Sequence, residues 1–283
     1  MNTTDMMTPA EELEDRIVDE VIEEEHEEEQ EATPESDTIR PNSATLLVDE
    51  TSSRFSGAIW AEAIRKKTVT LAGVGGIGSY VGFLLSRVKP GRIMLYDPDR
   101  VESANMSGQL YDRNSVGQSK VSALSNYMMN FSCFYDIYSY DSRFEETSPS
   151  SEIMICGFDN MAARRTFYEA WKNKVNMMPE EEQGKALFID GRLAAEEFQV
   201  FCIKGDDNYH MKQYEDKWLF SDEEAEETIC SYKQTSHCAN MIASVMVNLF
   251  VNFVANQCEP LIDRDVPFMT SYDASTIYFK TVS

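Results

Sequence analysis

A glycine-rich loop is the first segment whose residue types and spacing point to chemistry. Its glycines are Gly73, Gly75, Gly76 and Gly78. The loop follows an apolar, β-branched run at 68–72 and precedes a run at 80–88 with apolar residues at helical spacing. In such a loop Gly73 permits a tight turn, Gly75 lets the backbone approach a phosphate, and Gly78 lets helix and strand pack closely. Because the start of a helix offers free N–H groups and the positive end of its dipole, the loop predicts a site for a phosphate-bearing ligand.

An aspartate stands at the position where a nucleotide site needs one. Asp97 lies 19 residues after Gly78 and follows a second apolar run at 92–96. A carboxylate at the end of this strand accepts hydrogen bonds from ribose hydroxyls. Strand, loop, helix and acid in this order indicate a nucleotide, and NAD and ATP both fit. Glycines that serve only packing are the remaining explanation.

The segments after Asp97 distinguish these nucleotides. They read D-P-D-R-V-E-S-A-N-M-S-G-Q at 97–109, V-G-Q-S-K at 116–120 and G-F-D-N-M-A-A-R-R at 157–165. Together with the glycine loop, this order resembles the ThiF/MoeB/ubiquitin-activating-enzyme family of adenylating enzymes. The resemblance covers roughly residues 54–170 and weakens after about residue 185.

The resemblance implies a role for each matching residue. It implies ATP with Mg²⁺ as the ligands, phosphates on the glycine loop and a Mg²⁺ on Asp159. A homodimer is implied as well, in which Arg54 reaches the ATP of the second protomer. The remaining nucleotide and transition-state contacts would come from Asp97, Asp99, Asn105, Gln109, Lys120 and Asn160.

The implied reaction suits these residue types. A substrate carboxylate, already ionised at pH 7, attacks the α-phosphorus of ATP and expels pyrophosphate. This needs no general base, but the atoms must be held in line and the charge neutralised. Lys120 and a Mg²⁺ on Asp159 would neutralise it.

Structural explanations compete with these roles. Lys120 would be a solvated side chain at a helix start, Asp159 would cap the helix at 161–173, Asn105 would serve a turn, and Arg164 would pair with surface acids. The stretch 190–192 (D-G-R) reads as an ordinary turn, or as a guide for a substrate's C-terminal tail.

One position departs from the family pattern. Gly108 stands where the family usually has an arginine that contacts phosphate, so the departure would slow adenylation or mark a degenerate site. Arg100 and Arg113 are close enough in sequence to replace it.

Cys230 is the candidate nucleophile for a later transfer step. It lies in a polar stretch near Lys233, which favours the thiolate. Cys238 begins an apolar helix, and Cys156 and Cys202 fall in apolar strands, so these three are expected in the core.

Alternating strands and helices predict an α/β fold. We expect a Rossmann-like, doubly wound sheet, mostly parallel, with helices on both faces and antiparallel strands at the C-terminal end. The expected strands are 68–72, 92–96, 134–138, 153–157, 186–190 and 198–203, with a hairpin in 267–282. The expected helices are 80–88, 119–131, 161–173 and 240–255.

Charge divides the chain into two parts. Residues 1–50 carry 18 of the 49 acids and two bases, and the whole chain has a net charge of −24. We expect 1–50 to be an acidic, disordered tail and 51–283 to be the adenylating domain. The charge excludes nucleic acid as the main partner. The apolar stretch at 241–254 is shorter than the ~20 residues of a membrane helix, and no secretion signal opens the chain, so we expect a cytoplasmic protein.

The expected function is ATP-dependent adenylation of a protein's C-terminal carboxylate. The resemblance implies a small ubiquitin-like or sulfur-carrier partner that ends in glycine, with thioester or sulfur transfer as a possible next step. The alternative is a nucleotide-binding scaffold of the same fold that has lost turnover. An NAD(P)-dependent oxidoreductase ranks last, because no Ser-Tyr-Lys constellation appears in order.

Overall fold

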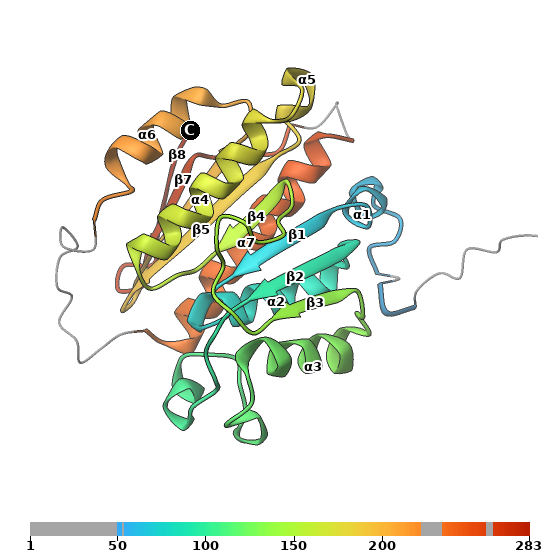
Figure 1. Cartoon of the computed structure of the whole chain (residues 1–283), viewed down its shortest axis with the longest axis vertical. Coiled ribbons are helices and arrows are strands. Elements are labelled where there is room, and N and C mark those ends of the chain that lie inside the picture. Colours follow the sequence, from blue (N-terminus) through green and yellow to red (C-terminus); the bar gives the residue numbers. More distant parts are fainter. Residues whose placement is uncertain (1–49, 53, 222–233, 259–262) are drawn as a thin grey trace, which may run out of the picture. The chain divides into compact units, whose positions relative to one another are not determined.

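An eight-stranded sheet forms the centre of the protein (Figure 1). The structure is a computed structural model that describes residues 50–52, 54–221, 234–258 and 263–283. The strands lie in the order β3-β2-β1-β4-β5-β6-β7-β8. Pairs from β3 to β5 are parallel, and pairs from β5 to β8 are antiparallel. The strand bounds are β1 Thr68–Ala72, β2 Arg92–Tyr96, β3 Ile137–Tyr140, β4 Ile153–Cys156, β5 Leu187–Ala194, β6 Glu197–Lys204, β7 Met269–Asp273 and β8 Tyr278–Val282.

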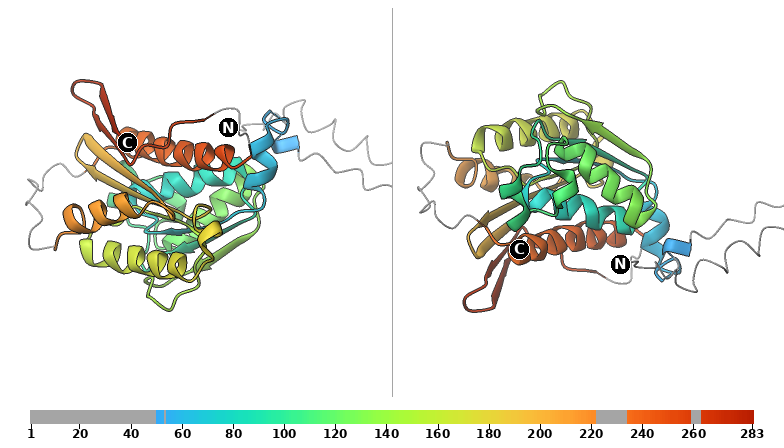
Figure 2. Two further views of the ribbon diagram at one scale, coloured as in Figure 1. Left: turned by 90° about the horizontal axis from the view of Figure 1, so that it is seen from above. Right: turned by 90° about the horizontal axis from the view of Figure 1, so that it is seen from below.

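Helices cover both faces of the sheet, as the sequence predicts (Figure 2). The faces carry separate cores: α2, α3 and α7 pack into one, and α4 and α6 into the other. The helix bounds are α1 Ile59–Ile64, α2 Gly76–Val88, α3 Lys120–Ser132, α4 Met161–Asn176, α5 Glu180–Gln183, α6 Asn208–Lys217 and α7 Ser236–Asn256. Short 3-10 turns lie at Glu50–Ser52, Ser103–Ser107 and Arg113–Ser115. The fold is the predicted doubly wound α/β sheet.

The strand order determines at which edge of the sheet a ligand is expected to bind. From β1 the chain moves outward to β2 and β3, then returns to the other side of β1 to form β4. The connections after β1 and β4 therefore leave in opposite directions and open a crevice at the carboxyl ends of these strands. The glycine loop follows β1, Asp97 follows β2 and Asp159 lies just beyond β4, so the topology brings the three motifs to one edge.

Two local predictions are wrong. The third strand begins at Ile137 instead of Phe134, because α3 ends at Cys133 in the left-handed conformation (φ 49°) and Phe134 packs into the core. Residues 190–192 form no turn; they continue β5, which pairs with β6 through Ala194. Gly191 is needed in this strand because a Cβ there would lie 2.6 Å from the Met246 sulfur of α7.

Helix α7 is longer than the apolar stretch that predicts it. By length and composition alone its 21 residues suffice to cross a membrane, with a mean hydropathy of 1.7. However, 61% of that window is buried, and α7 packs against α2, β5 and β6. Cys238, Cys156 and Cys202 are buried as expected. The predicted acidic tail (1–50) lies outside the described residues, except for Glu50.

Candidate functional site

A cavity of about 770 Å³ lies at the carboxyl ends of β1, β2 and β4. Most of the candidate residues line it: Gly73, Gly75, Gly76, Asp97, Asp99, Gln109, Lys120, Asp159 and Asn160. Other lining residues include Tyr96, Arg143, Phe144, Phe158, Leu193 and Gln234. Segments that are far apart in the sequence therefore converge on one concave site with polar and apolar walls.

The glycine loop is held by hydrogen bonds to its neighbours. Gly73 has a φ of 75°, a conformation that glycine adopts without strain. The Val74 N–H donates to the Asp97 carboxylate at 2.8 Å, and the buried Tyr111 hydroxyl donates to the Val74 carbonyl at 2.6 Å. A Cβ on Gly78 would overlap the Gly73 carbonyl oxygen. Gly78 thus shapes the loop without lining the cavity.

Asp97 is a buried carboxylate beneath this loop. Only 6% of its surface is exposed, and its other oxygen accepts from the Asp99 N–H at 2.9 Å. Burial raises the pKa of Asp97, and the hydrogen bonds and the nearby Lys120 oppose that rise. Asp97 therefore fixes the loop, whatever else it contacts.

Lys120 is buried and paired instead of solvated. Its side chain is 9% exposed, and its Nζ lies 2.9 Å from Asp99 Oδ2. Lys120 is also the first residue of α3, where the helix dipole disfavours a cation. The structure thus holds a buried ammonium beside the cavity by means of Asp99.

Asp159 and Asn160, which follow Phe158, have different roles in the structure. Asn160, not Asp159, caps α4: its side-chain oxygen accepts from the Ala163 N–H at 2.8 Å. Asp159 is exposed at the cavity, and its Oδ1 accepts a hydrogen bond from the Asn160 amide at 3.2 Å. The capping explanation for Asp159 is therefore wrong, and its carboxylate faces the cavity.

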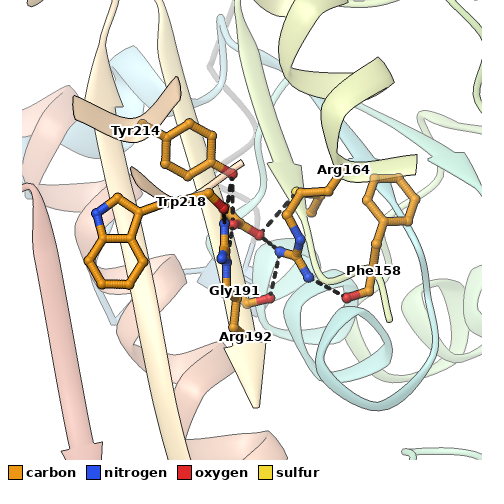
Figure 3. A network of polar contacts seen from close by, with 8 residues as sticks. Phe158, Arg164, Gly191, Arg192, Tyr214 and Trp218 are labelled. Atoms are coloured by element: carbon orange, nitrogen blue, oxygen red, sulfur yellow. Dashed lines mark hydrogen bonds and ion pairs between the residues drawn. The ribbon is translucent and has the colours of Figure 1, made fainter. Parts of the chain in front are cut away.

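Arg164 belongs to a buried network and not to the surface (Figure 3). Its guanidinium pairs with Asp190, which is fully buried, and donates to the carbonyls of Gly191 and Phe158. Asp190 also accepts from Arg192 Nε at 2.8 Å and from the Tyr214 hydroxyl at 2.8 Å. Because Phe158 lies in the cavity wall, the network fixes the turn that presents Asp159.

Besides Gly78, two predicted residues in the described part of the chain lie outside the cavity lining. Asn105 accepts from the Glu102 N–H at 2.8 Å within the 3-10 turn at 103–107, so its structural role is the turn. Arg54 is exposed in a turn before α1. Cys230 lies outside the described residues.

A sequence model of the ThiF family matches residues 50–283. The chain belongs to the ThiF family. This confirms the resemblance that the motifs carry, and it extends the match beyond residue 185 to the end of the chain.

Known relatives match shorter stretches. Ubiquitin-like modifier-activating enzyme 5 of Caenorhabditis elegans is 50% identical over 62 residues, which are 22% of this chain and 15% of that enzyme. Its counterpart in Gallus gallus is 35% identical over 82 residues, 28% of this chain and 21% of the enzyme. The matches thus span less than a quarter of these relatives.

Solved structures share the fold. The crystal structure of PaaA aligns with a TM-score of 0.58 at 16% identity, covering 78% of this chain and 65% of PaaA. The structure of Escherichia coli MccB with ATP aligns with a TM-score of 0.55 at 15% identity, covering 84% of this chain and 73% of MccB. At these identities the likeness establishes the ThiF-type architecture alone.

Several lining residues of this ThiF-family cavity are not predicted by the motifs. Arg143 lies in the connection after β3, and it is exposed at the cavity. Arg100 and Arg113, which the sequence suggests as replacements for an arginine at 108, are not among the lining residues. Arg100 instead donates to the Gly117 carbonyl at 3.0 Å. Arg143 is thus the cavity's arginine among the described residues.

An aromatic wall is the second unpredicted feature. Tyr96 and Phe144 line the cavity and pack edge to face, with ring centroids 5.2 Å apart. Phe158 completes the wall, and Phe167 packs behind it at 5.5 Å. Because Tyr96 and Phe144 are buried, a flat, apolar base would pack mainly against the partly exposed Phe158 ring.

Magnesium fits the donors that the cavity offers. No group of three or more His, Cys, Asp or Glu residues that could cage a metal occurs in the described part of the chain. Mg²⁺ does not need such a cage, because it commonly binds one or two carboxylates, water and substrate phosphates. Asp159 is an exposed carboxylate of this kind.

Proposed function

We propose that the chain binds ATP with Mg²⁺ and adenylates the C-terminal carboxylate of a small protein. The observation that carries this proposal is the cavity itself. It joins a glycine loop at the start of α2, a buried lysine, an open carboxylate and an aromatic wall. The loop and α2 offer N–H groups to phosphates, Asp97 and Asp99 lie within reach of a ribose, and the wall accepts a base.

The geometry supports adenylation because the reaction is mainly a problem of charge and alignment. The substrate carboxylate attacks the α-phosphorus, an acyl–phosphate bond forms, and the bond to pyrophosphate breaks. Lys120 would stabilise the developing charge after releasing Asp99, with which it forms an ion pair in the structure. Mg²⁺ on Asp159 would supply further charge neutralisation at the phosphates.

A second groove offers a path for the substrate protein. Its volume is about 700 Å³, and it lies over the antiparallel strands β5 to β8. Leu193 lines both this groove and the cavity. A peptide that follows the groove across Leu193 would enter the nucleotide cavity end first.

The composition of this groove suits the narrow tail of a β-grasp protein. Arg192, Gln199, Ser271 and Lys280 face each other across four strands in one row. Gln199 and Ser271 can bind the backbone amides of an extended peptide, and Lys280 can pair with its terminal carboxylate, whereas Arg192 is held by Asp190. Because Arg192 lines the groove, residues 190–192 support the alternative in which they guide a tail, here as part of a strand.

Further steps follow the family resemblance. We propose that a thiolate of Cys230 attacks the acyl-adenylate, which forms a thioester and releases AMP. We propose also that the protein acts as a homodimer, with Arg54 reaching the second site. These steps rest on the sequence motifs and on the family resemblance.

ATP–pyrophosphate exchange tests the adenylation. The assay uses the full chain, MgATP, labelled pyrophosphate and each β-grasp protein of the source organism that ends in glycine. We expect exchange with one of these proteins and its loss in Asp159→Ala. Glu169→Ala is the matched control, because Glu169 is an exposed carboxylate on α4 outside the cavity.

The same measurements distinguish the alternatives. Binding of MgATP without exchange for any partner would favour the catalytically inactive scaffold. Binding of NADH, measured by its fluorescence, in preference to ATP would favour the oxidoreductase. Exchange that persists in Asp159→Ala would contradict the role given to that carboxylate.

A further inference from the structure

Gln234 lies in the nucleotide cavity although no motif in the chain points to it. It precedes α7 by two residues and lines the cavity beside Gly75 and Gly76. Its amide is so close to the start of α2 that a Cβ on Gly76 would overlap it. A Cβ on Gly108 would lie 3.1 Å from Gln234 Cγ and 3.2 Å from its Nε2. Two glycines therefore leave the space that the Gln234 side chain fills.

The backbone on both sides holds Gln234 in this place. Gln234 forms an isolated parallel bridge with Ala195, next to the end of β5. Two residues later, Ser236 begins α7, which packs against α2. The position of the amide is thus set by the sheet and by two packed helices.

The Gln234 amide lies at the start of α2, where the phosphates of a bound nucleotide are expected. Within the described residues no hydrogen bond joins the Gln234 side chain to any group, including the N–H groups at the start of α2. An amide that merely plugged the phosphate site would be expected to accept from those N–H groups. Its neighbour in the cavity, Gln109, likewise has a buried Oε1 without a partner in the described structure. A phosphate oxygen on the loop would satisfy the Gln234 Nε2 donor.

We propose that Gln234 is a phosphate-binding residue that donates a hydrogen bond from its amide to the polyphosphate of the bound nucleotide. This deepens the proposed function and rests on it. A neutral amide supplies direction without charge, so the cationic contribution in the cavity remains with Lys120 and Arg143. Gln234 would therefore distinguish nucleotides by their phosphates and not by their base.

Nucleotide titrations of the full chain with Gln234→Ala and Gln234→Glu test the proposal. Dissociation constants are measured by calorimetry for MgATP and for adenosine. We expect Gln234→Ala to weaken MgATP binding about fivefold, the usual effect of one hydrogen bond. Gln234→Glu keeps the shape but adds a negative charge, so we expect a weakening of more than about tenfold. Adenosine should bind all three proteins equally.

A matched control separates a local from a general effect. Gln213→Glu adds the same charge on α6, outside the cavity, and should leave both constants unchanged. Adenosine binding by each variant also shows that its cavity is folded.

The contradicting outcomes are distinct. Unchanged or tighter MgATP binding by Gln234→Ala would overturn the proposal, and tighter binding would mean that the amide occupies the phosphate site. Equal losses for adenosine and MgATP would overturn it in favour of a structural role. Failure of the unmodified chain to bind MgATP would overturn the proposed function together with this inference, whereas normal wild-type binding with insensitive variants would overturn the inference alone.

Discussion

Replacing Asp190 by asparagine should destabilise the protein more than most single substitutions. The Asp190 side chain is fully buried, and it faces two cations, Arg164 at 5% and Arg192 at 15% side-chain exposure. Asparagine keeps the size of the side chain, so the change removes charge without opening a cavity. The guanidinium of Arg164 then stays buried without its counter-charge. Removing one partner of such a pair costs about 3–5 kcal/mol, and we expect about 4 kcal/mol of unfolding free energy.

Urea unfolding followed by tryptophan fluorescence measures this change. Trp218 is a suitable reporter because its carbonyl accepts from Arg192 at 2.8 Å, beside the network (Figure 3). As a comparison, Arg192→Met removes the more exposed cation but keeps an apolar stem over the Phe201 ring, where the guanidinium lies 4.8 Å from the centroid. We expect Arg192→Met to lower the unfolding free energy by about 1–2 kcal/mol.

A double variant provides the decisive control. Arg164→Met combined with Asp190→Leu removes the more deeply buried ion pair and fills its space with apolar atoms, while Arg192, the more exposed cation, loses Asp190 in both variants. We expect this double variant to be more stable than Asp190→Asn, because the uncompensated charge of the buried Arg164 is gone. A loss below about 1 kcal/mol for Asp190→Asn, or a double variant that is less stable than it, would refute the reasoning from buried charge.

Three other predictions follow from single features. Asn160→Ala should lower the unfolding free energy by about 1 kcal/mol, because α4 loses its cap. Asp159→Ala should change the unfolding free energy by less than about 0.5 kcal/mol. Equal losses in urea unfolding would contradict the conclusion that Asn160, and not Asp159, caps the helix. Gly78→Ala should lower the unfolding free energy by more than about 3 kcal/mol, since its Cβ would overlap the Gly73 carbonyl oxygen. A melting temperature like that of the unmodified chain would contradict this expectation. Burial raises the pKa of Cys156 to about 11, so at pH 8 only about one thiol in a thousand is ionised. Mass spectrometry should show that iodoacetamide modifies the exposed Cys133 before the buried Cys156, and that Cys156 reacts faster as the pH rises towards 11. Rapid modification of Cys156 at pH 8 would contradict its burial.

Much of the parallel half of the fold is predictable from local pattern. β1 and β2 have the predicted bounds because each is a short apolar run, buried on four of five positions and ended by a turn. The polar helix α6 is not predicted, since Met211 and Tyr214 are its buried residues and its start depends on the Asp207 cap. Such a helix forms because neighbours cover it, which a single stretch of sequence does not reveal.

The residues of the candidate site likewise fall into those that local sequence predicts and those that it does not. The glycine loop, Lys120 and Asp159 are predicted because each belongs to a contiguous motif. Arg143 and Gln234 lie on segments that reach the cavity only through tertiary packing, and their local sequence carries no signal. Arg164 is misread as a surface residue for a related reason: its partner Asp190 is 26 positions away, on a strand that lies beside β4 only in the folded sheet.

The glycines show why motifs define this site incompletely. Gly73 is a glycine because of its positive φ, and its role can be inferred from the loop alone. Gly76 and Gly108 have a different requirement, namely the space that Gln234 occupies. A Cβ at 108 would press against Gln234, whose side chain would have to shift by a few tenths of an ångström, so the family's usual arginine and this glutamine compete for the same space. On this reasoning Gly108 need not mark a degenerate site. It marks a cavity in which one phosphate-facing side chain arrives from the start of α7 instead of from the turn after β2.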